Sequence, residues 1–389
     1  MNNDHVFYEI FPLSLNRDGE EVCGDQVKIS RTPDKTIMVL SDGLGSGIKA
    51  TILARLTTEI IVNMLRADAP LGEVLETVTK TLPVCHVRKL AYATFAILQI
   101  QHSRGRFELV RFDSPPAVLL KNRKRVRLET RSETVGGKLL NLSEGVLEQG
   151  DFLGLMSDGV LYADKSVTMN TRWGWDEVAA CLEKAAQTGR GSAEAMARTV
   201  IRETQRRYGG KAGDDATFVG VLARKPRRLM IFTGPPADTT QDEACAERLL
   251  HFDGQRVACG GTTGNIVAQY LGRIVRTDNS TARDGIPPVG YLPEIELVTE
   301  GILTLARTLE FLKNYEAHHR RLPADPNGAV LLSRELLQAD SILLLAGESV
   351  NPYYQNPQLP RSISIRRSLV TQIAEVLKRL QKNVIVEWI

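Results

Sequence analysis

The sequence has few cysteines, few aromatic residues and almost no excess of charge of either sign. Its five cysteines are odd in number and no two have the CxxC spacing, so neither a disulfide framework nor a zinc ribbon is expected. A net charge of +3 over 389 residues is too small to indicate a nucleic-acid-binding surface. No apolar run reaches the length of a membrane span, and the first residues lack a basic segment followed by an apolar core. We therefore expect a cytoplasmic protein that binds neither nucleic acid nor membranes.

The composition is otherwise that of an ordinary globular protein, with 43% hydrophobic and 24% charged residues. Its length allows two or three domains. The basic segment RKPRR at 224–228 interrupts the pattern of strands and helices and has the character of a linker. We therefore expect one domain over residues 1–224 and a second, smaller domain over residues 225–389.

Residues 40–50, with the sequence LSDGLGSGIKA, form a corner between a strand and a helix. The apolar run at 37–40 predicts a buried strand that ends at Asp42. The following residues predict an amphipathic helix over 48–66, because apolar side chains recur every fourth position at Ile52, Leu56, Ile60 and Met64. Taken alone, Ser-Asp-Gly is as well explained by a turn in which the aspartate caps the helix. The glycines also let the corner expose main-chain oxygens beside the carboxylate.

A tight turn upstream determines which residue faces Asp42 on the neighbouring strand. Pro33 and Asp34 occupy the centre of a four-residue segment with type I turn chemistry, so the strands before and after it are expected to pair antiparallel. Residues whose numbers sum to 67 then face each other, which places Asp25 opposite Asp42. Facing carboxylates with Cβ atoms about 5 Å apart repel each other unless a cation lies between them.

Further acidic residues occur at the ends of other predicted strands. The strand 152–156 ends in a second Ser-Asp-Gly, which contains Asp158, and the strand 218–222 is preceded by Asp214 and Asp215. Adjacent acidic residues at a strand entrance are usually a solvated turn. Together with Asp25 and Asp42, however, they form a set of carboxylates without histidine or cysteine, which favours hard cations such as Mg²⁺ or Mn²⁺.

In this order, the motifs resemble those of the metal-dependent PPM (PP2C-type) protein serine/threonine phosphatases, in the bacterial SpoIIE branch that acts in partner switching. The resemblance covers about residues 4–224 and rests on CGDQV (23–27), SDGLGSGIKA (41–50), SPP (114–116), GDFLGLMSDGV (150–160) and GDDATFVGV (213–221). It implies an α+β fold, an αββα sandwich of two antiparallel sheets flanked by helices. The C-terminal domain resembles no family that we can name.

The resemblance also implies a binuclear centre of two Mn²⁺ or Mg²⁺ ions. Asp42 would bridge the ions, the Gly43 carbonyl would bind one of them, and Asp25 would bind directly or through water. Asp158 and Asp214 match the other direct ligands, and Asp215 stands where relatives carry a second acidic or amide residue. Asp42, Asp158 and Asp214 are the implied catalytic residues.

The implied activity is hydrolysis of phosphoserine or phosphothreonine on a protein by a water that bridges the two ions. Animal members carry a histidine, often regarded as the general acid, where this sequence has Leu44. Since the sporulation branch also has hydrophobic residues there, we expect a slow, regulated enzyme. In that branch the helices after Asp42 act as a switch, and whether those at 48–66 and 71–82 do so is open.

The C-terminal domain is expected to be an α/β layer structure, because short apolar strands alternate with helices. Strands at 229–233, 255–259 and 342–346 each end in a glycine-bearing loop, which predicts a shared edge where α/β sheets bind ligands. Helices are expected near 242–250, 265–271, 298–315 and 366–382. The loop from Gly260 to Asn265 is a candidate site for a small anionic ligand, although these glycines fit ordinary strand-to-helix turns equally well.

Two functions from different classes follow. The first is a bacterial protein phosphatase that depends on Mn²⁺ or Mg²⁺ and acts on a phosphoserine or phosphothreonine regulatory protein. Its C-terminal domain would regulate the enzyme or dock a partner. The second is a catalytically weak signalling module whose C-terminal domain senses a ligand. Retention of several repelling carboxylates favours the enzyme. The substrate protein, a regulatory protein partner and the choice between monomer and homodimer are left open.

Overall fold

The computed structural model of the chain describes residues 6–81, 93–163, 173–188, 191–318, 322–324, 326–349 and 361–389. Two compact units make up the chain, Met1–Lys225 and Pro226–Ile389, and each is described separately below. None of the helices formed by the described residues combines the length and apolar character that a membrane crossing requires.

The N-terminal unit contains two antiparallel sheets. In spatial order, the five-stranded sheet consists of β1 (Phe7–Leu15), β11 (Ala216–Arg224), β10 (Phe152–Met156), β6 (Val118–Lys121) and β7 (Lys124–Val126). The six-stranded sheet consists of β2 (Asp25–Arg31), β3 (Lys35–Gly43), β4 (Ala93–Gln101), β5 (Arg106–Phe112), β9 (Lys138–Val146) and β8 (Arg131–Val135). A shared apolar core joins them, because alternate residues such as Leu40 and Leu98 of one sheet pack against Leu155 and Val219 of the other.

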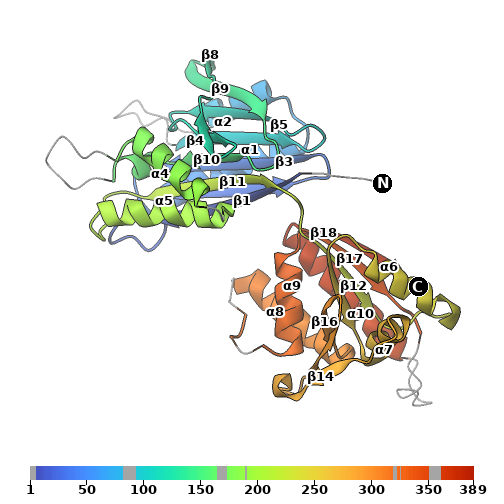
Figure 1. Cartoon of the computed structure of the whole chain (residues 1–389). Helices are drawn as coiled ribbons and strands as arrows, with labels where there is room; N and C mark the ends of the chain where they lie inside the picture. Colours follow the sequence, from blue (N-terminus) through green and yellow to red (C-terminus); the bar gives the residue numbers. More distant parts are fainter. Residues whose placement is uncertain are drawn as a thin grey trace. The chain divides into compact units, whose positions relative to one another are not determined.

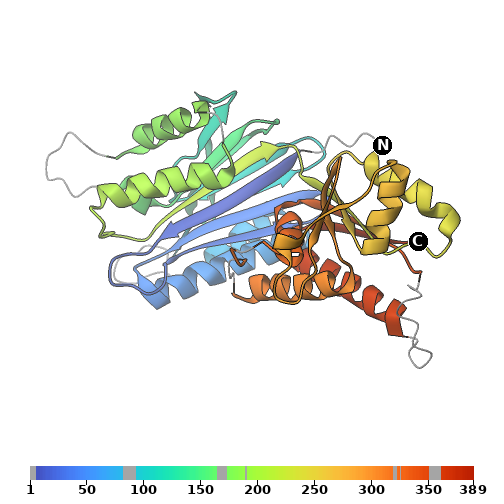
Figure 2. The same cartoon turned by 60° about the horizontal axis from the view of Figure 1, so that its bottom comes forward.

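Helices cover the outer face of each sheet (Figure 2). The helices α1 (Gly47–Arg66) and α2 (Leu71–Thr81), drawn in blue, pack on the six-stranded sheet. The helices α4 (Trp175–Gln187) and α5 (Ala193–Arg207), drawn in green, pack on the five-stranded sheet. A single turn, α3 (Asp158–Leu161), follows β10. The predicted αββα sandwich is therefore confirmed.

The β2–β3 hairpin has the register that its turn predicts. Thr32 and Lys35 close the turn through a hydrogen bond from the Thr32 amide to the Lys35 carbonyl (2.9 Å). Every pair along the two strands sums to 67, from Arg31 opposite Thr36 to Asp25 opposite Asp42. Because side chains alternate between the two faces of a sheet, both aspartates lie on the face that carries Leu40, which is the face between the sheets.

The prediction for the apolar stripe of α1 was wrong in its first half. Ile61 and Leu65 are buried against the sheet, as expected. Ile52 and Leu56, however, are 59% and 45% exposed, and Ile48 is 70% exposed. The small residues of α1, among them Ala50 and Ala54, face the protein in this half, so the larger apolar side chains point outward.

The β8–β9 hairpin was absent from the sequence-based prediction. Its turn is Gly136-Gly137, and both residues have positive φ angles, 59° and 77°. A Gly-Gly pair between two alternating runs is a recognised hairpin signal, so the information was present in the sequence. The neighbouring β6–β7 hairpin likewise turns through Asn122 and Arg123, both at positive φ.

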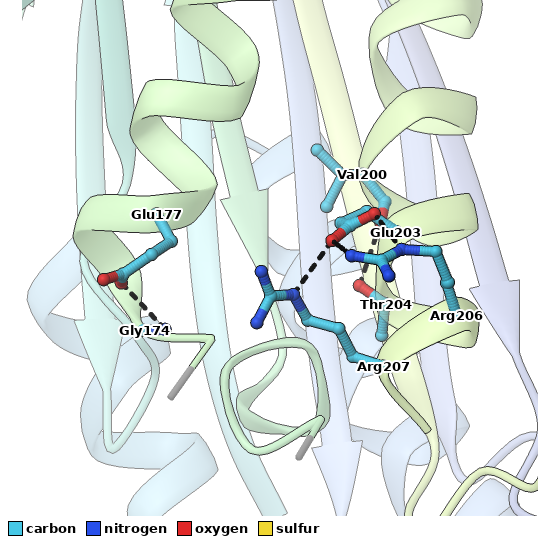
Figure 3. A network of polar contacts seen from close by, with 7 residues as sticks. All are labelled: Gly174, Glu177, Val200, Glu203, Thr204, Arg206 and Arg207. Carbon is cyan, nitrogen blue, oxygen red and sulfur yellow. Dashed lines mark hydrogen bonds and ion pairs between the residues drawn. The ribbon is translucent and has the colours of Figure 1, made fainter. Parts of the chain in front are cut away.

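The start of α4 and the end of α5 are held by local polar contacts (Figure 3). The backbone N–H of Gly174 donates to the Glu177 carboxylate (3.0 Å), which caps α4. The Glu203 carboxylate accepts from the guanidinium groups of Arg206 (2.6 Å) and Arg207 (2.9 Å) at the last turn of α5. The two arginines also interact favourably with the partial negative charge of the helix C-terminus, so they stabilise the end of α5.

The C-terminal unit has one mixed sheet between two helical layers (Figure 1). In spatial order its strands are β14 (Arg276–Asp278), β15 (Val289–Leu292), β16 (Ile295–Thr299), β13 (Gln255–Cys259), β12 (Arg228–Thr233), β17 (Ser341–Ala346) and β18 (Asn383–Trp388). The last five are parallel. One face packs against α6 (Asp242–Leu250) and α7 (Gly261–Tyr270), and the other against α8 (Ile302–His318), α9 (Gly328–Gln338) and α10 (Arg361–Arg379).

Two predicted elements of the C-terminal unit need correction. The helix expected over 298–315 begins only at Ile302, and Val298 belongs to β16, where it is buried against the sheet core. The helix expected over 265–271 begins earlier, at Gly261. The first error arises because a short apolar run does not by itself distinguish a buried strand from a helix. The second arises because the glycines at 260, 261 and 264 favour a turn, although this segment forms the first turn of α7. The strand β18 and the helix α9 were not predicted.

Candidate functional site

The acidic residues singled out in the sequence gather at one edge of the sandwich. Asp25 begins β2 and Asp42 lies near the end of β3. Asp158 lies two residues after the end of β10, and Asp215 directly precedes β11, the antiparallel neighbour of β10. Strand ends from both sheets therefore meet here, and Asp214 lies beside Asp215.

Ser157 connects the two sheets at this edge. Its hydroxyl donates to Oδ2 of Asp25 (2.7 Å) and accepts from the backbone N–H of Thr217 (2.8 Å). Asp25 and Ser157 come from different sheets, so this contact closes the sandwich around the carboxylates. Sequence reasoning missed this role, although serine precedes aspartate in both copies of Ser-Asp-Gly. The other copy differs, because the Ser41 hydroxyl donates to the Thr94 carbonyl (2.7 Å).

Two of the carboxylates are deeply buried and only partly hydrogen-bonded. Asp25 is 2% and Asp215 4% exposed. Oδ1 of Asp215 accepts from the backbone N–H of Arg17 (3.0 Å), and the Asp215 N–H itself donates to Asp214 (2.9 Å). Oδ1 of Asp25 and Oδ2 of Asp215 are buried and have no hydrogen-bond partner. Buried oxygens of this kind are costly unless a ligand satisfies them.

The carboxylates have raised pKa values because they are buried and lie close to one another. Burial first, and then the charges of Asp25, Asp158 and Asp214, raise the pKa of Asp42 to about 9, and a hydrogen bond with Asp158 adds to the increase. Burial is also the main reason why the pKa of Asp25 is raised to about 6, with Asp215 and Asp158 contributing. The pKa of Asp214 is raised for the same reasons. The site therefore holds more negative charge than it can keep without a cation.

Glycines at this edge are required by close backbone contacts. A Cβ atom on Gly43 would lie 2.1 Å from the carbonyl oxygen of Ala50, in the first turn of α1. A Cβ on Gly159 would lie 2.0 Å from the carbonyl oxygen of Asp215. The β3–α1 corner and the loop before β11 therefore pack against neighbouring backbone, which fixes the positions of Asp42 and Asp158.

Whether these residues suit a metal centre can be tested on the structure. The donor set is entirely carboxylate and carbonyl oxygen, and two of its oxygens are buried without partners. Burial, together with mutual repulsion, raises the pKa of three members. These properties fit hard divalent cations. Over the described residues, however, no group of three or more His, Cys, Asp or Glu side chains is arranged to hold an ion as it stands. To hold a cation, side chains of the cluster would have to reorient.

A second candidate edge lies in the C-terminal unit. The parallel strands β12, β13 and β17 end side by side at Thr233, Cys259 and Ala346, as predicted, and each is followed by a glycine. The guanidinium group of Arg366 donates to the carbonyls of Gly347 (3.0 Å) and Ser349 (3.1 Å) at this edge.

The loop from Gly260 to Asn265 is mostly the first turn of α7 rather than a free loop. The Thr263 hydroxyl accepts the backbone N–H of Gly234 (2.9 Å), which ties α7 to the end of β12. Near it, the Thr304 hydroxyl and one Glu300 oxygen are buried without a hydrogen-bond partner. The edge therefore carries both an arginine and a carboxylate, in contrast to the uniformly acidic edge of the N-terminal unit.

Comparisons with known proteins agree with the fold. The family model for stage II sporulation protein E (SpoIIE) matches residues 32–224. The PP2C phosphatase domain with a regulatory fragment of SpoIIE from Bacillus subtilis is similar at 18% identity and a TM-score of 0.50, over 57% of this chain and 65% of that one. The RsbU and RsbW domains of Rv1364c from Mycobacterium tuberculosis are 17% identical, with a TM-score of 0.48, over 63% and 70% of the two chains.

This chain thus spans less than two thirds of the Bacillus subtilis SpoIIE structure. A search of curated proteins found no match. The matched segment contains Asp42, Asp158, Asp214 and Asp215, and Asp25 lies just before it. The ordered motifs, the αββα sandwich and the family match point to the same conclusion: residues 32–224 belong to the SpoIIE family and have the PP2C-type phosphatase fold.

Proposed function

We propose that this protein is a metal-dependent phosphatase that hydrolyses phosphoserine or phosphothreonine on a regulatory protein. The observation that carries the proposal is the pair Asp25 and Asp42, which face each other across β2 and β3 with raised pKa values and a buried, unpartnered oxygen. A site used only for packing has no need of facing carboxylates, because their repulsion destabilises the fold.

The residues that would hold two divalent cations are the five aspartates of the cluster and the carbonyl of Gly43. Bound there, such ions lower the pKa of a water and neutralise the phosphoryl oxygens of the substrate. The chain contributes positioning, since Ser157 orients Asp25 and the Arg17 amide orients Asp215. The N-terminus of α1 adds partial positive charge near the same corner, with no acidic residue in the first turn of the helix.

Protonation of the leaving group is not provided by the β3–α1 corner. Leu44, which is half-buried there, has no proton to donate. The leaving serine or threonine oxygen must then take its proton from water, and this is consistent with a slow enzyme that a partner controls. The helices α1 and α2 are the candidates for such control, because α1 begins four residues after Gly43.

Hydrolysis of a phosphoserine peptide by the full chain, with and without Mn²⁺, tests the proposal. Wild type is expected to require the metal, and Asp42→Asn is expected to reduce the rate at least about a hundredfold, because one of the carboxylates that would hold the ions is lost. Glu133→Gln, which alters an exposed carboxylate on β8, is the control and should keep the wild-type rate. Metal-independent hydrolysis, or full activity of Asp42→Asn, would contradict the proposal.

A catalytically silent signalling module is the second candidate. It is favoured by one observation, that the described side chains are not yet arranged to hold an ion. Equilibrium dialysis with Mn²⁺ separates the two functions. An enzyme should bind close to two ions per chain, and Asp42→Asn should bind fewer. A wild-type protein that takes up no Mn²⁺ would favour the silent module.

We also propose that the C-terminal unit regulates the phosphatase or docks a partner, and that it binds a small anionic ligand at the edge formed by Gly234, Gly260 and Gly347. Support comes from Arg366, whose guanidinium group lies so close to Gly234 that a Cβ there would approach Nη1 to 2.4 Å. Hydrogen exchange of the full chain with inorganic phosphate should show protection at the start of α7. Arg366→Met should abolish that protection, and protection that persists in the variant would argue against this site.

A further inference from the structure

A cavity of about 430 Å³ lies in the N-terminal unit, outside the carboxylate cluster, and is lined by arginines. Three of its lining residues are Arg111, Arg125 and Arg127, and a single carboxylate, that of Asp176, lines it with them. Its walls include Trp175 and the apolar side chains of Val126 and Leu128. Of the sequence motifs only SPP touches this cavity, through Pro116, and the proposed reaction does not use it.

The cavity lies at the same edge of the sandwich as the carboxylates. Asp42 pairs with Thr94 on β4, and the next residue, Phe95, pairs with Phe112 on β5. Across β4, Arg111 is in register with Leu40 of β3, which lies two residues before Asp42. Adjacent strands are about 4.8 Å apart, so β5 lies roughly 10 Å from β3.

Arg111 also points to the same side of its sheet as Asp42. On β5, residues 107, 109 and 111 share a face, and both Phe107 and Leu109 belong to the core between the sheets. The corresponding core residue on β3 is Leu40, two positions before Asp42. The arginine and the aspartate therefore both face the space between the sheets, where that space opens.

The charge of Arg111 is buried and unpaired. The residue is 5% exposed, its Nη1 donates to the carbonyl of Ser114 (3.1 Å), and its Nε is buried with no partner. None of the carboxylates in the described part of the chain forms an ion pair with it, and burial lowers its pKa. A buried cation without a counter-charge destabilises the fold, and an anion in the cavity would supply the missing partner.

The single carboxylate of the cavity is already engaged by another arginine. Asp176 pairs with Arg125 (2.7 Å), whose guanidinium group lies 5.6 Å from the centre of the Trp175 ring. Arg127 is exposed and the structure shows no acidic partner for it in the described residues. Arg111 and Arg127 therefore leave the cavity with an excess of positive charge.

The wall formed by the start of α4 is held in place. The indole N–H of Trp175 donates to the carbonyl of Pro116 (2.9 Å), in the segment that leads into β6. Gly174 caps the helix through Glu177 (Figure 3). The guanidinium group of Arg207 lies 4.6 Å from the centre of the Trp173 ring. These contacts hold the start of α4 in place, so this wall of the cavity is part of the packed fold.

We propose that this cavity binds an acidic side chain of the phosphoprotein substrate, a glutamate or aspartate that flanks the phosphorylated residue. This inference rests on the proposed phosphatase function and adds the chemistry of the substrate segment. The spacing of roughly 10 Å between β3 and β5, combined with the offset of two residues along the strand, separates Arg111 from Asp42 by roughly 12 Å. This corresponds to three to four residues of an extended chain, so the preferred acidic position is about three residues from the phosphoserine. Hydrogen bonds from Arg111 and Arg127 would hold the carboxylate.

Kinetics with paired peptides test the specificity. One phosphoserine peptide carries glutamate three residues before and after the phosphoserine, and its partner carries glutamine at both positions. Wild type is expected to prefer the acidic peptide about tenfold in kcat/KM, the size of one buried charge-assisted hydrogen bond, and mainly through KM. Arg111→Met and Arg127→Gln should each reduce this ratio, Arg111→Met to near one. Lys124→Gln, next to Arg125 on β7 but outside the cavity lining, is the matched control and should keep the ratio.

A binding measurement separates failure of this inference from failure of the proposed function. The same peptides with unphosphorylated serine are titrated while tryptophan fluorescence is recorded, and Trp175→Phe identifies the signal from the cavity. The acidic peptide should change the Trp175 signal of wild type at concentrations about tenfold lower than the glutamine peptide, and this difference should vanish in Arg111→Met. Binding without hydrolysis of any peptide would leave the cavity assigned and refute the phosphatase.

Hydrolysis of both phosphopeptides at equal kcat/KM, with equal titrations, would overturn the inference while the phosphatase stands. An unchanged acidic preference in both Arg111→Met and Arg127→Gln would overturn it as well. Circular dichroism of each variant excludes loss of the fold as the cause of a changed ratio.

Discussion

The carboxylate cluster and the arginine cavity lie at one edge of the same sandwich and have opposite electrostatic defects. The cluster contains buried oxygens of Asp25 and Asp215 without partners, and the cavity contains the buried Nε of Arg111 without one. In the folded chain alone, each defect lowers stability, because buried polar and charged atoms lose their hydration without replacement. Each defect is relieved by a ligand of the opposite sign, a cation in the first case and an anion in the second.

The two regions differ in how they are built. The cluster comes from strand ends whose positions follow from hairpin register and close backbone contacts, as at Gly43. The cavity comes from one residue of β5, a hairpin and the start of α4, which are joined only by the tertiary fold. The comparison teaches that a site made by local register can be predicted from sequence, whereas a site made by packing of distant elements cannot.

The largest expected effect comes from disrupting the backbone that supports the cluster. Gly43→Ala would place a Cβ 2.1 Å from the Ala50 carbonyl, so the β3–α1 corner must move, and the free energy of unfolding should fall by about 2–4 kcal/mol. Gly72→Ala in α2 is the control, because a Cβ there meets nothing within 4 Å and alanine favours a helix. Chemical denaturation measures both, and equal stability of Gly43→Ala and wild type would contradict the packing described.

Removing the charge of Asp42 should stabilise the metal-free protein. Its pKa rises on folding from an ordinary value of 3.8 to about 9, so the folded state retains a proton that the unfolded state releases. The contribution of Asp42 to stability should therefore be greatest below about pH 4 and should be lost as the pH rises towards 9. At pH 8 without metal, Asp42→Asn should raise the free energy of unfolding by at least about 1 kcal/mol.

Denaturation of Asp42→Asn and wild type at pH 5 and pH 8, with and without Mn²⁺, measures this effect. The stabilising effect of the variant should be larger at pH 8, and Mn²⁺ should stabilise wild type more than the variant. A variant that is less stable than wild type at pH 8 without metal would show that the carboxylates are not in mutual repulsion.

Removing the charge of Arg111 in the cavity should increase the free energy of unfolding by a smaller amount. Arg111→Met removes a buried unpaired cation but also the hydrogen bond to the Ser114 carbonyl, so the free energy of unfolding should increase by up to about 1 kcal/mol. Arg104→Met, at an exposed turn after β4, should have no effect. A loss of more than about 2 kcal/mol in Arg111→Met would indicate a structural cation instead.

The smallest effect is expected at the exposed arginine of the cavity. Arg127→Gln should change the free energy of unfolding by less than about 0.5 kcal/mol, because its side chain is solvated in the free protein. Salt dependence sharpens the contrast with Arg111, since screening weakens exposed charges more than buried ones. Thermal denaturation at low and high ionic strength checks this, and a large salt-independent change would place Arg127 in a buried contact.

The hairpin at Pro33 and Asp34 shows how far sequence reasoning reaches. Turn chemistry alone predicted that Asp25 faces Asp42, and the register confirms it. The same reasoning did not find the bridge made by Ser157, because that contact joins the two sheets and depends on how they stack. The burial of Arg111 was unpredictable for the same reason, since an isolated strand does not show which face a second sheet will cover.

Helical periodicity was a weaker guide than turn chemistry. The apolar periodicity of α1 predicts that the face with Ile52 and Leu56 is buried. Both residues are exposed, because small side chains face the sheet in this half of the helix. In the C-terminal unit, Val298 was assigned to a helix although it lies in β16. The Gly136-Gly137 hairpin was readable from its turn residues and was missed, so this error lies in the interpretation and not in the sequence.

The turn between β2 and β3 also limits which insertions and deletions the protein tolerates. Exposed turns usually tolerate insertions, and this one lies roughly 25 Å along the strand from the carboxylates. A single inserted residue between Pro33 and Asp34 would nevertheless shift the pairing, and restoring hydrogen bonds in the new register would turn the side chain of Asp25 to the opposite face. Insertions and deletions at this distant, solvent-exposed position should therefore be as damaging to the site as substitution of an aspartate.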